Sequence, residues 1–212
     1  MMEAIVSCLL QNGRFDLQEL DSIKSRFVSQ TISKGGYFSE AGKIARQVGF
    51  VTSGIFRVCT YDQEGEEFTR AFVDENRLIV DYNSFTNEIP CRAFIQALTD
   101  CELFVIGRAD FIELSGAIPD WEPTISRIML STMMRKVTEA GALLSSDGKQ
   151  RYETFLERYP GLVNRIPLSA LASYLGVTQS SLSRIRKISE RFCLFAKWQN
   201  PCGGVRLDLC HK

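Results

Sequence analysis

The side chains best suited to chemistry in this sequence gather between positions 178 and 188. They are the hydroxyl, amide, guanidinium and ammonium groups of Thr178, Gln179, Ser180, Ser181, Ser183, Arg184, Arg186 and Lys187. Gln pairs with adenine, and Arg with guanine, through two hydrogen bonds, while Ser accepts several partners. Arg and Lys also neutralise phosphates. These residue types favour contact with double-stranded DNA, although a solvated helix surface can have the same composition.

The neighbouring residues predict the helix–turn–helix that would position this stretch. Pro167 suits the first turn of a helix. The apolar face of that helix is formed by Leu168, Leu171, Ala172 and Leu175. Gly176 stands where a sharp turn needs a positive φ, and Thr178 is a good N-cap for the next helix. The inward positions of this second helix are Leu182, Ile185 and Ile188. We therefore expect residues 178–188 to be a recognition helix that presents outward Gln179, Ser180, Ser183, Arg184, Arg186 and Lys187.

The charge distribution points the same way. The formal net charge is zero. Residues 147–212 nevertheless hold 11 basic and 5 acidic residues, whereas residues 1–146 hold 14 and 20. A basic C-terminal third attached to an acidic body is typical of a polyanion-binding module.

Composition limits the other classes of protein. No apolar run approaches the roughly 20 residues that a membrane span needs. The N-terminal segment has no basic region before its apolar residues, so we expect no signal peptide, no membrane partner and a cytoplasmic protein. Seven scattered cysteines without a CxxC pair are expected to be reduced thiols. The tail residues Cys202, Cys210 and His211 form the one set that suggests a metal site, and we expect no metal.

The middle of the chain predicts an all-β region after helical spacing in residues 3–27. Residues 54–73 have the pattern of a hairpin in which Gly65 supplies the positive φ of the turn. Residues 93–106 resemble a second strand pair around Thr99 and Asp100. Short strands at this spacing predict a sandwich or jelly roll.

Helical spacing returns near residue 109 and continues to about 144. One apolar stripe consists of Ile118, Trp121, Ile125, Ile128 and Thr132. A neighbouring stripe consists of Met129, Met133, Val137, Ala140 and Leu144. A helix packed only on its own domain is one interpretation. We favour a helix with one stripe on the β domain and the other paired with a second subunit.

Taken together, residues 15–190 resemble the cyclic-AMP receptor protein and fumarate-nitrate regulator superfamily of bacterial transcription regulators. The segments that carry the resemblance are FVTSGIFRVCTYDQEGEEFTRAFV, ALTDCELFVI, the long helix and IPLSALASYLGVTQSSLSRIRK. It implies an α+β chain with three parts. These are a β-roll (jelly-roll, cyclic-nucleotide-binding-like) sensor at 1–117, a dimerisation helix at 118–145 and a winged helix-turn-helix domain at 146–212. By position in the motif, the base-reading residues would be Gln179, Ser180 and Arg184.

The predicted effector pocket departs from the cyclic-nucleotide pattern of this superfamily. That pattern holds the sugar-phosphate with Gly-Glu on one segment and Arg-Ser-Ala on the next. Here Val80 and Asp81 stand at the first pair, and Cys91, Arg92 and Ala93 stand where the resemblance places Arg, Ser and Ala. The expected pocket residues are Asp81, Tyr82, Cys91, Arg92 and Ala93. A one-residue slip that brings Arg92 to the phosphate would turn its side chain to the other face of a strand. We therefore expect no cofactor, no ordinary binding of cyclic AMP, and either an unknown small effector or none.

The sequence thus predicts a dimeric, sequence-specific DNA-binding transcription regulator that reads a palindromic operator. Its expected partners are double-stranded DNA, a second copy of itself and RNA polymerase. The alternative is a ligand-binding or interaction module whose helical domain contacts proteins. An enzyme is not expected, because the chain has no P-loop, GxGxxG or GxSxG, and its single histidine is His211.

Overall fold

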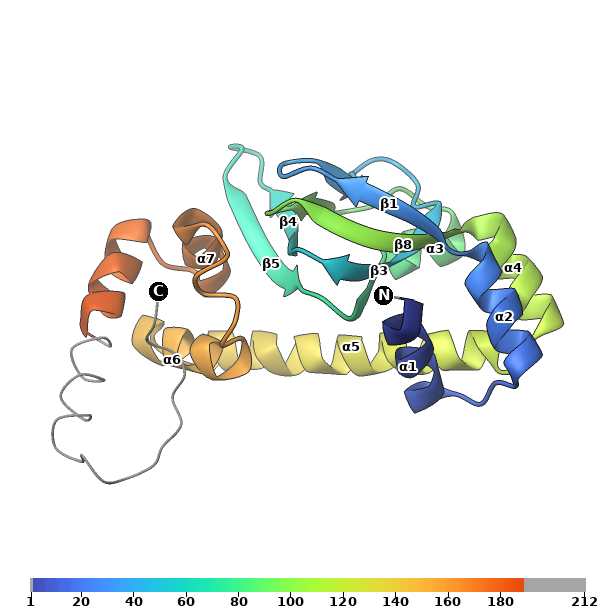
Figure 1. The fold of residues 1–212 in the computed structure, drawn as a ribbon. Helices are drawn as coiled ribbons and strands as arrows, with labels where there is room; N and C mark the ends of the chain where they lie inside the picture. Colours follow the sequence, from blue (N-terminus) through green and yellow to red (C-terminus); the bar gives the residue numbers. More distant parts are fainter. Residues whose placement is uncertain (1, 189–212) are drawn as a thin grey trace, which may run out of the picture. The chain divides into compact units, whose positions relative to one another are not determined.

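The computed structural model of the chain describes residues 2–188 and divides the chain into two compact units (Figure 1). The first unit is Met1–Glu139 and the second is Ala140–Lys212. The division falls inside the longest helix, α5 (Trp121–Ser145). None of the helices within residues 2–188 is long and apolar enough to cross a bilayer.

The first unit opens with two helices, α1 (Met2–Asn12) and α2 (Leu17–Arg26), as the sequence predicts. Asp16 lies between them and is the N-cap of α2. Its side chain accepts a hydrogen bond from the Glu19 N–H at 2.8 Å, and the Glu19 carboxylate accepts one from the Asp16 N–H at 2.8 Å. This capping box satisfies backbone donors that the first turn leaves without partners.

Eight strands form two four-stranded antiparallel sheets in a jelly-roll arrangement. The strands are β1 (Val28–Ile32), β2 (Tyr37–Ser39), β3 (Gln47–Ser53), β4 (Phe56–Tyr61), β5 (Glu67–Val73), β6 (Arg77–Ile79), β7 (Phe94–Ala97) and β8 (Cys101–Gly107). One sheet has the order β1-β8-β3-β6 and the other β2-β7-β4-β5. Two short helices, α3 (Tyr82–Asn87) and α4 (Arg108–Ala117), complete the part before α5. The predicted β-roll is therefore confirmed.

One predicted hairpin is confirmed and the other is wrong. β4 and β5 pair antiparallel around Gly65, which has φ +82°. β7 and β8, by contrast, lie in different sheets. Thr99 and Asp100 between them are bound to other loops, since Thr99 accepts the Ile55 N–H at 3.0 Å and Asp100 accepts the Lys34 N–H at 2.8 Å. Residues 98–100 therefore connect one sheet to the other and do not form the turn of a hairpin.

The N-terminal half of α5 belongs to the core of the first unit. Its buried apolar residues are Trp121, Ile125, Ile128 and Met129, and they pack in one cluster with Ile5 and Leu9 of α1 and with Phe50 of β3. Figure 1 shows α1 alongside α5 beneath the strands. This apolar stripe is intramolecular, as the sequence predicts for one side of the helix.

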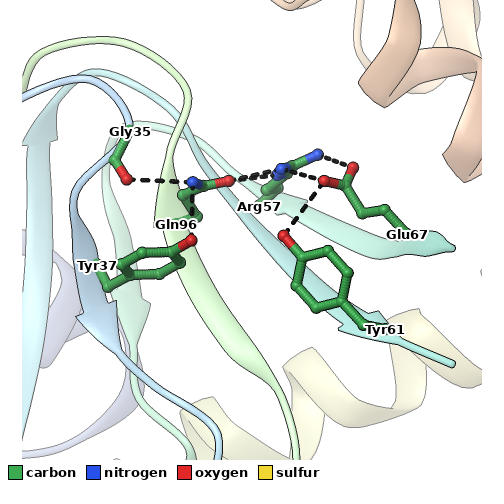
Figure 2. A network of polar contacts seen from close by, with 6 residues as sticks. All are labelled: Gly35, Tyr37, Arg57, Tyr61, Glu67 and Gln96. Atoms are coloured by element: carbon green, nitrogen blue, oxygen red, sulfur yellow. Dashed lines mark hydrogen bonds and ion pairs between the residues drawn. The ribbon is translucent and has the colours of Figure 1, made fainter. Parts of the chain in front are cut away.

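A buried ion pair stiffens the sheet that contains β4 (Figure 2). Arg57, which is 8% exposed, makes two bonds to the carboxylate of Glu67 and donates its Nε–H to Gln96 Oε1 at 3.0 Å. Gln96 in turn donates to the Gly35 carbonyl at 3.1 Å and to the Tyr37 hydroxyl at 3.2 Å. The network thus connects β2, β7, β4 and β5 through side chains as well as through their backbones.

The second unit contains α6 (Gly148–Arg158), α7 (Leu168–Leu175) and a further helical stretch at 179–188. Asp147 caps α6 by accepting the N–H groups of Lys149 and Gln150, both at 2.9 Å. Its core joins aromatic rings from two helices, with Phe155 5.3 Å from Tyr159 and 5.7 Å from Tyr174 between ring centroids. The wing predicted after the second helix lies outside the described residues.

Candidate functional site

The turn between the two C-terminal helices has the geometry that its sequence predicts. Gly176 ends α7 in the left-handed conformation, at φ 61° and ψ 40°. Its N–H donates to the Ser173 carbonyl at 3.2 Å, and the Val177 N–H donates to the Ala172 carbonyl at 3.0 Å. These two bonds form a Schellman motif, which reverses the chain within three residues. The turn therefore fixes where the next helix begins.

Thr178 is the N-cap of that next helix, as predicted. Its Oγ1 accepts the Ser181 N–H at 3.1 Å, and its carbonyl accepts the Leu182 N–H at 2.9 Å. The same Oγ1 lies 2.9 Å from the Ser181 hydroxyl and 3.0 Å from the Ser180 hydroxyl. The row of small hydroxyl residues thus organises the first turn of this helix before any partner arrives.

The helix at 179–188 is anchored on one side and open on the other. Leu182 is fully buried, and Ile185 packs against the start of α6, where a β-carbon on Gly148 would lie 3.4 Å from it. Among the predicted DNA-contacting residues, Thr178, Gln179, Ser180, Arg184 and Lys187 are exposed. Ser181, Ser183 and Arg186 are half-buried.

Two sequence expectations about this helix need correction. Ile188 was expected to face inward, but it is 47% exposed, because it lies on the side of the helix away from Leu182. Arg186 was expected to face outward with Lys187, but it is half-buried, because it lies one turn from Leu182. The open face is centred on Gln179, Ser180 and Arg184.

A cavity of about 720 Å³ lies in the first unit between the strands and α5. Its wall is largely apolar and includes Val58, Val73, Ile79, Ile95, Met129 and Met133. Four cationic side chains also line it, namely Arg70, Arg77, Arg135 and Lys136. Volume and lining are typical of a small-molecule site, where a few polar groups orient a mostly apolar ligand.

The structure brings only part of the predicted pocket together. Asp81, Tyr82 and Ala93 line the cavity. Cys91 does not, because it is 4% exposed within the apolar core. Backbone bonds to the Gly42–Lys43 turn hold it there, since its N–H donates to the Lys43 carbonyl at 2.8 Å and its carbonyl accepts the Gly42 N–H at 2.9 Å. Arg92 is exposed and is not part of the lining.

Asp81 has a structural task at the edge of the cavity. Its side chain caps α3 by accepting the Ser84 N–H at 3.1 Å. A carboxylate at this position opposes a ligand phosphate rather than binding it. With Cys91 in the core and Arg92 outside the lining, the residues present do not fit the cyclic-nucleotide pattern described above.

Sequence reasoning missed the cations of the cavity, although the sequence held a signal for Lys136 and none for Arg70. Met129, Thr132, Met133 and Lys136 recur at steps of three and four, so that they share one face of α5. Arg70 is brought in by a β-bulge, since Val58 pairs with Ala71 but Cys59 pairs with Thr69, which leaves Arg70 without an opposite residue. Burial and the nearby charge of Arg135 lower the pKa of Lys136.

The C-terminal half of α5 exposes an unusual number of large apolar side chains. Leu130, Met133, Met134 and Val137 are each between 59% and 67% exposed. Two of them, Met133 and Val137, belong to the second stripe of the sequence prediction. The first stripe is buried in its own unit except for half-buried Thr132. Met129 was expected in the second stripe but also packs in that core, so the exposed surface begins at Leu130.

Comparison with known proteins identifies the first unit. The family model of the cyclic nucleotide-binding domain matches residues 29–116. FixK2 from Bradyrhizobium japonicum has a similar structure, with a TM-score of 0.67 at 14% identity over 85% of this chain and 88% of that one. Residues 29–116 therefore form a cyclic nucleotide-binding domain, and the chain shares the fold of FixK2. Among curated proteins, no sequence matches it.

Two further solved structures have a similar fold over most of the chain. The regulator CLP of Xanthomonas campestris has a TM-score of 0.66 at 15% identity, over 84% of this chain and 94% of that one. The catabolite activator protein of Thermus thermophilus has a TM-score of 0.54 at 20% identity, over 93% and 90%. At these identities the likeness shows the fold alone. Within residues 2–188, no cluster of His, Cys, Asp and Glu is suited to a metal ion, and Cys202, Cys210 and His211 lie outside that range.

Proposed function

We propose that the chain is a dimeric, sequence-specific DNA-binding transcription regulator. The observation that carries this proposal is the open face of the helix at 179–188, where Gln179, Ser180 and Arg184 are exposed while Leu182 anchors the other side. Small residues at the start of such a helix let its backbone approach the major groove closely. Gln and Arg then reach base edges with paired hydrogen bonds.

Charge supports a polyanionic partner for the second unit. Residues 140–188 contain seven basic and three acidic residues. Lys187 is exposed beside the proposed base-reading face, and Arg186 flanks it. Cations at the edge of a recognition helix neutralise phosphates and set its register on DNA.

A second copy of the chain is the proposed partner of α5. The exposed apolar residues Leu130, Met133, Met134 and Val137 form one continuous surface on two turns of this helix. Apolar surface on a long helix is stabilised by burial against a matching helix. A symmetric dimer would present two recognition helices to half-sites about 34 Å apart, which is one turn of DNA. RNA polymerase is the proposed partner of the bound dimer.

We further propose that the first unit binds a small effector other than cyclic AMP. The residues that stand at the cyclic-nucleotide positions support this, since Cys91 is in the core and Asp81 caps α3. One structural neighbour, CLP, is described as a global regulator that responds to c-di-GMP and links cell–cell signalling to virulence gene expression. Another carries the name catabolite activator protein. Their fold is compatible with a sensor role for this unit.

The deciding experiment is selection of bound sites from a random DNA pool with the full chain. A regulator of the proposed kind selects a palindrome, and its affinity falls steeply with salt. The protein-interaction alternative predicts no selected sequence and only weak binding. A selected sequence without two-fold symmetry would retain DNA binding but contradict the dimer.

A further inference from the structure

Four cationic side chains line the cavity of the first unit, and only two of them form ion pairs within residues 2–188. Arg135 pairs with Glu139 at 3.3 Å, and Arg77 pairs with Asp74. Arg70 donates only to the neutral hydroxyl of Thr60, at 3.3 Å. Lys136 has neither hydrogen bond nor ion pair within the described residues. Two of the four cations that line the cavity therefore make no ion pair within the described residues, although the charges of Glu139 and Asp81 act on Lys136 from nearby.

These two cations come from different elements of the fold. Arg70 projects from the bulge in β5, and Lys136 belongs to the cavity face of α5. A bulge re-aims a side chain and is common beside binding sites. Lys136 is half-buried, and its pKa is lowered mainly by this burial and then by the charge of Arg135. An anion in the cavity would offset this cost, because an opposite charge stabilises the ammonium form.

The rest of the lining specifies the body of such an anion. Apart from the cations, the wall consists mainly of Val, Leu, Ile and Met side chains, and Asp81 is the one acidic residue in the described lining. The neutral polar side chains of the lining are Tyr82, Asn83, Thr86, Asn87 and Thr132. An apolar wall favours an aliphatic or aromatic skeleton, whose transfer from water is favourable by about 25 cal/mol per Å². A sugar-phosphate would instead need polar partners at the positions that Cys91 and Asp81 occupy.

We propose that this cavity binds an amphipathic organic acid, which has one anionic head on an apolar body, with Lys136 and Arg70 as the residues that recognise the head. The inference rests on the part of the proposed function that assigns an effector to this unit. It names the chemical class of that effector. A volume of about 720 Å³ accommodates a skeleton of drug-like size, since such sites measure roughly 300–1,000 Å³.

Calorimetry on the full chain tests this with matched probes. 4-Phenylbutyrate and 4-phenylbutan-1-ol have the same apolar body and differ in the charge of the head. We expect the acid to bind about ten-fold or more tightly than the alcohol, because a hydrogen bond to a charged group is stronger than a neutral one. Octanoate and anilinonaphthalene sulfonate extend the test to an aliphatic body and to another anionic head. Cyclic AMP is the competing ligand.

Charge-removing variants locate the recognition. Lys136→Met and Arg70→Met keep an unbranched side chain and are expected to bring the affinity for acid within about three-fold of that for alcohol. Lys43→Met is the matched control, since Lys43 is exposed, pairs with Glu40 and is not part of the cavity lining. A melting curve for each variant verifies that it is folded.

Several outcomes would overturn the proposal. Equal binding of acid and alcohol would show that the cavity does not recognise an anionic head. An unchanged preference for the acid in folded Lys136→Met and Arg70→Met would show that these two residues do not recognise it. Tighter binding of cyclic AMP than of every acid would indicate a cyclic-nucleotide site instead. No binding of any of the three acids below about 1 mM would exclude the class. DNA binding without ligand is measured on the same samples, so failure of the cavity proposal is distinguished from failure of the DNA-binding proposal.

Discussion

The backbone of Gly13 lies directly against the side chain of Thr124. A β-carbon on Gly13 would stand 2.0 Å from Thr124 Oγ1, 2.9 Å from the Phe15 ring and 3.0 Å from Asp120 Oδ2. This close approach brings the loop between α1 and α2 onto the first turn of α5. The loop is held there by two further bonds, from the Arg14 N–H to Asp120 at 2.7 Å and from Arg127 to the Asn12 carbonyl at 2.7 Å.

Gly13→Ala should therefore destabilise the first unit by about 1–3 kcal/mol, as overpacking in a fixed environment does. The measurement is chemical denaturation of both variants in parallel. Gly116→Ala is the matched control, because nothing lies within 4 Å of a β-carbon there and Gly116 is helical. We expect this control to be neutral or stabilising by up to about 1 kcal/mol. Equal effects of the two substitutions would contradict the close approach.

Acid should weaken the same contact through Asp120. Hydrogen bonds from the Arg14 N–H and then from the Arg127 side chain lower the pKa of this carboxyl. A lowered folded-state pKa adds stability above the unfolded value, about 3.9, and this stability is lost as the pH falls through the folded value. Asp120→Asn should thus destabilise at pH 7, and the difference from the unsubstituted chain should shrink between about pH 4 and pH 2.

The pH series can be measured by urea unfolding at each pH. Arg127→Met removes one of the three donors, the others being the Arg14 N–H and the Thr124 side chain, and should reproduce only part of the pH dependence. A constant difference between Asp120→Asn and the unsubstituted chain at all pH values would show that the carboxyl contributes nothing through its charge.

The buried pair of Arg57 and Glu67 predicts an asymmetric response to substitution. Arg57→Met removes the cation that pairs with the half-buried carboxylate of Glu67 and should cost about 1–3 kcal/mol. Adding Glu67→Gln should recover part of that loss, because the second substitution removes a charge that Arg57 no longer compensates. Lys43→Ala breaks an exposed pair and should cost less than about 1 kcal/mol. A double variant no more stable than Arg57→Met would contradict this account of the pair.

The dimer surface can be separated from the core of the same helix. Val137→Glu charges an exposed residue, so the variant should stay folded and sediment as a monomer of 23.9 kDa instead of a dimer of about twice that mass. Ile128→Glu is expected to unfold the first unit, since Ile128 is only 8% exposed within its core. Ile112→Glu makes the same change on exposed α4 and should leave the dimer intact. If the unsubstituted chain is a monomer that still binds DNA tightly, the proposed dimer through α5 is contradicted.

Base reading and phosphate binding should give different phenotypes on the proposed recognition helix. Arg184→Ala should cost about 1–3 kcal/mol on the preferred operator and relax preference at one base pair per half-site. Lys187→Ala should weaken binding to all sequences and make the salt slope shallower by roughly one per site. Titrations on operator and random DNA at several salt concentrations distinguish them. Equal losses on both DNAs for both variants would make Arg184 part of a solvated basic surface.

Features governed by a few neighbouring residues were predictable from the sequence by itself. Gly65 in the β4–β5 turn, Gly176 after α7 and the Thr178 cap are each determined by backbone dihedrals or by bonds within four residues. The periodicity of α5 is equally local, because it follows from 3.6 residues per turn.

Features that depend on distant partners were decided only by the tertiary structure. Thr99 and Asp100 separate β7 from β8 because they bind loops 44 and 66 residues away. Cys91 enters the core through its backbone bonds to the Gly42–Lys43 turn. Arg70 lines the cavity because of a bulge that exists only in the pairing of β5 with β4. A sequence pattern determines which side chains share a face, but the packing of distant segments decides whether that face meets core, cavity or solvent.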